Sequence, residues 1–110
     1  MAKIADATFN GRLGPYGFEV YPLDTRFISV GAVYVFTKRT VDASGKGSHE
    51  LLYIGETDSL AERIPNHEKW PRVLRLGANC ICVHRDDNGG SRLNKETDLR
   101  TANATACNEQ

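Results

Sequence analysis

Three apolar stretches rich in β-branched and aromatic residues predict three strands. They span residues 28–39 (ISVGAVYVFTKR), 51–57 (LLYIGET) and 79–84 (NCICVH). Two stretches of helix-forming residues, 60–70 and 91–103, follow the second and the third of these strands. The pattern therefore predicts elements in the order β-β-α-β-α.

This order predicts an α+β fold in which a small three-stranded sheet, antiparallel or mixed, is flanked by helices. At 110 residues the chain has the length of one domain. Residues 1–29 are rich in Gly and Pro, and we expect an irregular lead-in packed on a domain of residues 30–110, with one short edge strand near Phe18. Residues 40–50 are dense in Gly, Ser and charge, which predicts a long hairpin loop with His49 in solvent.

The helix after the second strand has a clear start signal and an early interruption. Ser59 and Glu62 have the spacing of a capping box. Pro65 falls beyond the first turn, where a proline kinks a helix, and Pro71 is expected to end it. Residues 72–77 then predict a second short helical turn closed by a glycine.

Composition indicates an ordinary globular protein, with 40% hydrophobic and 25% charged residues. Lys plus Arg and Asp plus Glu both number 14, and this zero net charge argues against strong nonspecific affinity for nucleic acid. Residues 60–95 nevertheless hold seven basic and four acidic side chains, an excess of three that suits either a phosphate-binding surface or a solvated helix face. No stretch has the length and apolar character of a membrane span or a secretory signal, so we expect a cytoplasmic protein without membrane contact.

Three cysteines form an odd, sparse set, which argues against a disulfide framework. Cys80, Cys82 and His84 would share one face of a strand, as metal ligands could. The spacing is not that of paired zinc ligands, and buried cysteine commonly behaves as a small hydrophobe. We therefore interpret Cys80 and Cys82 as packing residues.

Five residues carry the candidate chemistry. Arg63 and His67 are four apart, a spacing that an uninterrupted helix places on one face; arginine can hold a phosphate bidentately, and histidine can exchange protons near neutral pH. Tyr34 and Tyr53 lie in predicted strands, where a tyrosine is ordinarily a packed aromatic. Glu96 is one carboxylate of the kind that anchors Mg²⁺ together with waters and phosphate oxygens.

Taken in order, these segments resemble the GIY-YIG nuclease family from about residue 30 to residue 108. "AVY" (32–34) stands where the family has its first tripeptide, "YIG" (53–55) matches the second, and "LAERIPNH" (60–67) is similar to the helix that carries an Arg and, in one branch, a His. "ETDLRTANATACN" (96–108) is similar to the closing pattern of a Glu followed by an Asn, which makes Asn108 the match. Ala32 replaces the first glycine of the pattern, and Pro65 interrupts the Arg–His segment.

The resemblance implies a metal-dependent endonuclease that hydrolyses phosphodiester bonds of nucleic acid, DNA rather than RNA in our expectation, with one Mg²⁺ or Mn²⁺ ion held by Glu96. It implies Arg63 as the phosphate clamp and Tyr34 as general base or water-positioning group, the latter with a proton relay through His67. Tyr53 would bond the water or the phosphate, and Asn108 would hold the site together. Selectivity would come from a homodimer or a separate recognition partner. The alternative is a catalytically inactive binding or regulatory module. The zero net charge and the replacement of the first glycine by Ala32 favour this alternative.

Overall fold

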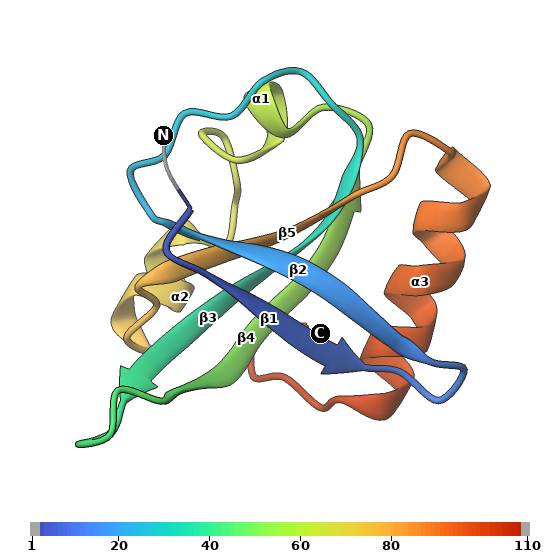
Figure 1. The fold of residues 1–110 in the computed structure, drawn as a ribbon. Helices are drawn as coiled ribbons and strands as arrows, with labels where there is room; N and C mark the ends of the chain where they lie inside the picture. The colour runs from blue at the N-terminus through green and yellow to red at the C-terminus, as the bar shows by residue number, and fades with distance from the viewer. Residues whose placement is uncertain (1–2, 109–110) are drawn as a thin grey trace.

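Five antiparallel strands form one curled sheet, a half-barrel, in the computed structural model, which describes residues 3–108 (Figure 1). The strands are β1 (Ala5–Asn10), β2 (Pro15–Pro22), β3 (Ala32–Val41), β4 (Gly47–Thr57) and β5 (Cys80–Arg85). Their order across the sheet is β1-β2-β5-β3-β4, with every neighbouring pair antiparallel. Strands β1 and β4 are therefore the two edges.

The predicted three-stranded sheet flanked by helices is wrong. The lead-in is not irregular, because it supplies β1 and β2, and β2 pairs with β5 inside the sheet rather than lying at an edge. The buried side chains of Phe9, Phe18 and Val20 alternate with exposed ones, as in strands covered on one face. Pro15 and Pro22 stand at the two ends of β2, where a missing N–H is tolerated. The Gly and Pro content of this segment concealed that alternation.

The hairpin loop predicted for residues 40–50 is also wrong, because most of it is strand. β3 and β4 pair as far as Val41 and Gly47, so only residues 42–46 turn. The Asp42 carboxylate accepts the backbone N–H groups of Ser44 and Lys46, and Gly45 takes the positive φ of 86° that the turn requires. His49 consequently lies on β4 and is half-buried rather than free in solvent.

The helices are α1 (Leu60–Arg63), α2 (Trp70–Arg75) and α3 (Gly89–Ala102). Ser59 precedes α1 but makes no side-chain cap bond, so the capping box expected with Glu62 does not form. α1 ends at Arg63, two residues before Pro65, so the helix expected over residues 60–70 is wrong beyond its first turn. Pro71 does not end a helix but lies in the first turn of α2, where a proline is tolerated, and α2 begins two residues before the turn predicted at 72–77. α3 confirms the last predicted helix. No helix among residues 3–108 has the length and apolar character needed to cross a membrane.

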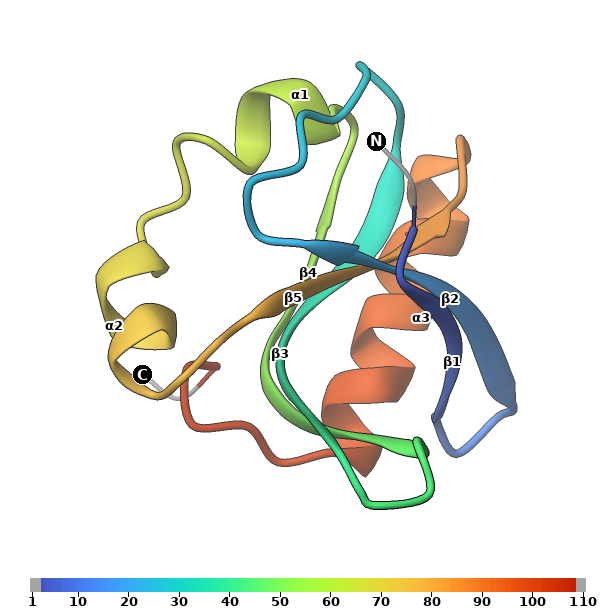
Figure 2. The same ribbon diagram turned by 60° about the vertical axis from the view of Figure 1, so that its left-hand side comes forward.

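The sheet buries an apolar cluster on each face. α3 covers the concave face, and α1 and α2 cover the other (Figure 2). The α3 side holds Phe9, Phe18, Val20, Val33, Val35, Ile54, Cys80, Cys82 and Leu99. The opposite cluster includes Tyr34, Phe36, Leu52, Tyr53, Leu60, Ile64, Val73, Ile81 and Cys107. The two candidate tyrosines therefore lie on the face covered by α1 and α2.

Candidate active site

The hydroxyl of Tyr34 is the centre of the candidate site. Tyr34 lies on β3, between β5 and β4, and is completely buried. Its oxygen lies 3.2 Å from Arg63 Nε, which donates to it, and 2.9 Å from His67 Nε2. Arg63 is the last residue of α1, and His67 lies in the segment between α1 and α2. The structure thus brings together three of the predicted site residues, although no single helix carries Arg63 and His67.

The hydrogen bonds of His67 determine which ring nitrogen carries the proton. The backbone N–H of Lys69 donates to Nδ1 at 3.1 Å, so Nδ1 is unprotonated. His67 is 4% exposed, and burial, together with the charge of Arg63, lowers its pKa to about 4, so the ring is neutral at pH 7. The proton therefore sits on Nε2 and is donated to the Tyr34 oxygen.

It follows that Tyr34 accepts two hydrogen bonds and keeps its own O–H free to donate. Burial, with a smaller effect of Tyr53, raises the pKa of Tyr34 well above its ordinary value, despite the opposing charge of Arg63. The phenol is neutral at pH 7. This arrangement suits a hydroxyl that positions a ligand oxygen better than a hydroxyl that removes a proton.

Arg63 is held in place by a carboxylate. Its two terminal nitrogens donate to the two oxygens of Glu68, Nη1 at 2.7 Å and Nη2 at 3.1 Å. This bond lowers the pKa of Glu68 to about 2. A bidentate carboxylate occupies the same fork that would clamp a phosphate, so an incoming phosphate must displace Glu68.

Gly55 makes room for the two tyrosines. It pairs with Tyr34 across β3 and β4, and a Cβ atom added to it would lie 2.6 Å from the Tyr34 oxygen and 2.8 Å from the Tyr53 ring. Tyr53 is 9% exposed, and its ring centre lies 4.8 Å from that of His67. Only glycine leaves space for this packing, which accounts for the glycine after "YI".

Asn108 covers the outer edge of β4 beside the site. Its side-chain amide exchanges two hydrogen bonds with the backbone of Ile54, 2.8 Å from the Ile54 N–H and 2.9 Å from the Ile54 C=O. Thr105 donates to the same amide oxygen, and the Cys107 N–H donates to the Leu52 carbonyl at 3.0 Å. The segment after α3 thereby satisfies an edge that would otherwise be open.

Glu96 lies on α3, the helix that packs against β4. Its carboxyl group faces the backbone N–H of Glu56, the residue after Gly55. Burial and the negative charge of Glu56 raise the pKa of Glu96, against the effects of Arg100 and that N–H. No hydrogen bond or ion pair within residues 3–108 joins Glu96 to Tyr34 or Arg63. Tyr34 faces the side of the sheet covered by α1 and α2, whereas Glu96 belongs to the helix on the other side.

Glu96 and Glu56 are the carboxylates that a magnesium-like ion could use in this part of the structure. Glu56 is a second carboxylate, whose Oε1 lies 3.0 Å from Arg92 Nε. Mg²⁺ commonly takes one or two carboxylates and completes its shell with waters and phosphate oxygens, so an ion at this place would compete with Arg92 for Glu56 and with Arg100, 3.9 Å from the Glu96 carboxylate. No cluster of three or more His, Cys, Asp or Glu side chains in the described part of the chain could hold a metal by itself.

The strand cysteines pack in the core. Cys80 and Cys82 belong to the apolar cluster under α3, and burial raises the pKa of the Cys82 thiol to about 12. Both ring nitrogens of His84 are engaged, Nδ1 with the Gly17 carbonyl at 2.8 Å and Nε2 with Lys95 at 2.9 Å. Protonated thiols beside an engaged histidine favour the packing interpretation.

The sequence reasoning missed Glu68, Glu56 and Arg92. Glu56 directly follows the "YIG" tripeptide on the same strand, a position that could have identified it. Glu68 gave no usable signal, because it lies five residues after Arg63 beyond the end of α1 and meets it through an irregular segment. Comparison with known proteins found no matching family model, curated protein or solved structure.

Proposed function

We propose that this protein is a metal-dependent endonuclease of the GIY-YIG type, which hydrolyses phosphodiester bonds of DNA. The observation that carries the proposal is the convergence of Arg63 and His67 on the buried hydroxyl of Tyr34, next to Gly55. A buried polar group of this kind is costly unless its partners are fixed. The guanidinium of Arg63 beside Tyr34 and the carboxylate of Glu96 on α3 are groups of the kind that phosphodiester hydrolysis uses.

Each side chain has a role consistent with its surroundings. Arg63, released from Glu68, donates two hydrogen bonds to nonbridging phosphate oxygens and stabilises the charge that develops there. Tyr34 would orient the attacking water or a phosphate oxygen through its O–H, which is completely buried in this structure and must become accessible when the substrate displaces Glu68. His67 donates to the Tyr34 oxygen. Tyr53 packs beside both, and Asn108 fixes the strand that carries Tyr53.

Glu96, with Glu56 nearby, would hold the divalent ion, Mg²⁺ or Mn²⁺. When bound, such an ion supplies positive charge that stabilises the phosphoryl oxygens and the leaving oxygen. Burial, with a smaller contribution from the negative charge of Glu56, raises the pKa of Glu96, and a bound cation would favour the ionised form of both carboxyl groups.

A second candidate function is a binding module without catalysis, and the Arg63–Glu68 bond favours it. A carboxylate already fills the arginine fork, and Tyr34 has no exposed surface. In such a module Glu68 would be a permanent structural partner of Arg63. In the nuclease, Glu68 would bind Arg63 only until a phosphate displaces it.

Cleavage assays separate the two functions. Supercoiled and branched DNA, with RNA as a comparison, are incubated with the protein and Mg²⁺ or EDTA. Arg63→Ala removes the clamp, and we expect at least about a hundredfold loss of cleavage rate. Arg72→Ala removes an exposed cation of α2 and serves as the matched control, which should cleave normally. DNA binding without cleavage by the unaltered protein would favour the binding module.

A further inference from the structure

One half of the edge of β4 is covered, and the other half is open. Cys107 and Asn108 cover the outward backbone groups of Leu52 and Ile54. On the open half, His49 of β4 pairs with Arg39 of β3. The hydrogen bonds of Arg39 therefore show which way the backbone groups of His49 point. The N–H and C=O of Arg39 bond the side chain of Asn79, on the β5 side, at 2.7 and 2.9 Å.

The backbone of His49 consequently points away from the sheet. In an antiparallel pair, two facing residues either both bond each other or both point outward. Because Arg39 turns its backbone groups toward Asn79, those of His49 face the free edge, and no backbone hydrogen bond with another segment of residues 3–108 involves them. An added strand could therefore exchange two hydrogen bonds with His49.

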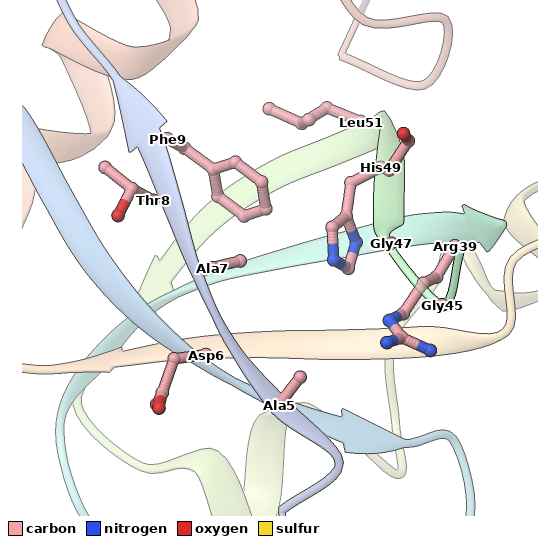
Figure 3. A pocket seen from close by; sticks show the side chains of 11 residues that line it. Ala5, Asp6, Ala7, Thr8, Phe9, Arg39, Gly45, Gly47, His49 and Leu51 are labelled. Carbon is pink, nitrogen blue, oxygen red and sulfur yellow. The ribbon is translucent and has the colours of Figure 1, made fainter. Parts of the chain in front are cut away.

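This open edge borders a groove of about 490 Å³. The groove runs between β1 and the start of β4, the two edges of the curled sheet (Figure 3). Phe9 from β1 and His49 from β4 point toward each other across it, with ring centres 5.5 Å apart. The small side chains of Ala5 and Ala7 line the β1 wall. The groove thus combines an aromatic contact, one shallow wall and a free strand edge.

Two nitrogen-bearing side chains of the groove have polar atoms without a partner among the described residues. Arg39 is half-buried, and no ion pair or side-chain hydrogen bond in residues 3–108 involves its guanidinium, which lies against Gly47. The Nδ1 atom of His49 bonds the buried Thr37 hydroxyl at 2.9 Å, which fixes the ring and leaves Nε2 as its other polar atom. An arginine without an acidic partner beside a fixed imidazole suits a carboxylate.

We infer that this groove binds an extended peptide segment of a partner protein, which adds a strand to β4 and places an acidic side chain opposite His49. Paired residues of neighbouring strands project to the same face, so that acidic side chain lies in one row with His49 and Arg39. Nucleic acid is a poorer fit, because the groove offers one cation, Arg39, and also contains Asp6. The proposed nuclease site lies around the other half of β4, so this surface is separate from it.

Short blocked peptides of alternating valine and threonine test the inference, with a central glutamate, glutamine or lysine. Affinity is measured by fluorescence anisotropy, and the place of binding by amide hydrogen exchange. We expect the glutamate peptide to bind about tenfold more tightly than the lysine peptide, with slower exchange at His49 and no change at Ile54. Arg39→Gln should abolish the preference for glutamate. Lys38→Gln, which removes the neighbouring exposed cation of β3, should retain it.

Three results would overturn the inference. One is equal affinity for the three peptides, or no binding of any. Another is a glutamate preference that survives Arg39→Gln in a variant with an unchanged melting temperature. The third is dimerisation of the protein without peptide, with slowed exchange at His49, which would assign the edge to a second copy of the chain. Loss of DNA cleavage bears only on the nuclease proposal, because none of these measurements involves nucleic acid.

Discussion

Acidification should destabilise this protein through His67. In the folded state the pKa of His67 is lowered to about 4 from the ordinary 6.5, chiefly by burial and then by the charge of Arg63. Between these values the unfolded chain binds more protons than the folded one, so stability is fully present above pH 6.5 and falls as the pH approaches 4. The difference between the two pKa values corresponds to about 3 kcal/mol of the free energy of unfolding. Carboxyl groups with lowered pKa values, such as Glu68 with a pKa of about 2, reduce the free energy of unfolding mainly at pH values below this range.

Urea unfolding at a series of pH values between 7 and 4.5 measures this loss. His67→Gln removes the titrating ring, and we expect the free energy of unfolding of this variant to change much less over the range than that of the unaltered protein. His49→Gln is the matched control. The pKa of His49 is also lowered, so His49→Gln should slightly reduce the dependence of the free energy of unfolding on pH and leave the contribution of His67 in place. Parallel losses in the unaltered protein and in His67→Gln would refute the burial of a neutral His67.

Three substitutions around the site give further expected outcomes. Gly55→Ala places a Cβ 2.6 Å from the buried Tyr34 oxygen and should lower the free energy of unfolding by about 1–3 kcal/mol; an unchanged thermal melt would contradict the close packing. Asn108→Ala leaves the outward N–H and C=O of Ile54 without a partner, which should lower the free energy of unfolding by about 1–2 kcal/mol and speed hydrogen exchange of the Ile54 amide. Unchanged exchange would contradict the hydrogen bonds between Asn108 and Ile54. Glu68→Gln frees the fork of Arg63, so DNA affinity measured by anisotropy should rise severalfold, and a fall would show that Glu68 assists binding.

The sequence predicted the elements whose local signals agree with their tertiary role. β3, β4 and β5 are rich in β-branched and aromatic residues, and α3 has strong helix formers behind an Asn88 cap. The prediction failed where local chemistry and tertiary pairing conflict. The Gly and Pro residues of the first 29 positions suggested loop, but pairing with β5 stabilises β2 through long-range hydrogen bonds that a local pattern does not report.

The candidate site shows the same division. Tyr34 and Tyr53 could be placed on strands, and their shared face follows from the strand register. Arg63 and His67 were paired through a helix that ends at Arg63, yet both reach the Tyr34 hydroxyl because the chain folds back between α1 and α2. The Glu68 partner depends on that irregular path, so no periodicity could have predicted it.

The most direct test of the central claim is a double-mutant cycle on DNA cleavage with Mg²⁺. It compares kcat for Arg63→Ala, Glu96→Ala and the double variant, with Asp87→Asn as an exposed acidic control. If Arg63 and Glu96 act on one phosphate across the edge of β4, each single substitution should remove most of the activity, and the double variant should be no slower than the slower single one. Losses that multiply, or cleavage that survives both substitutions, would contradict a single site.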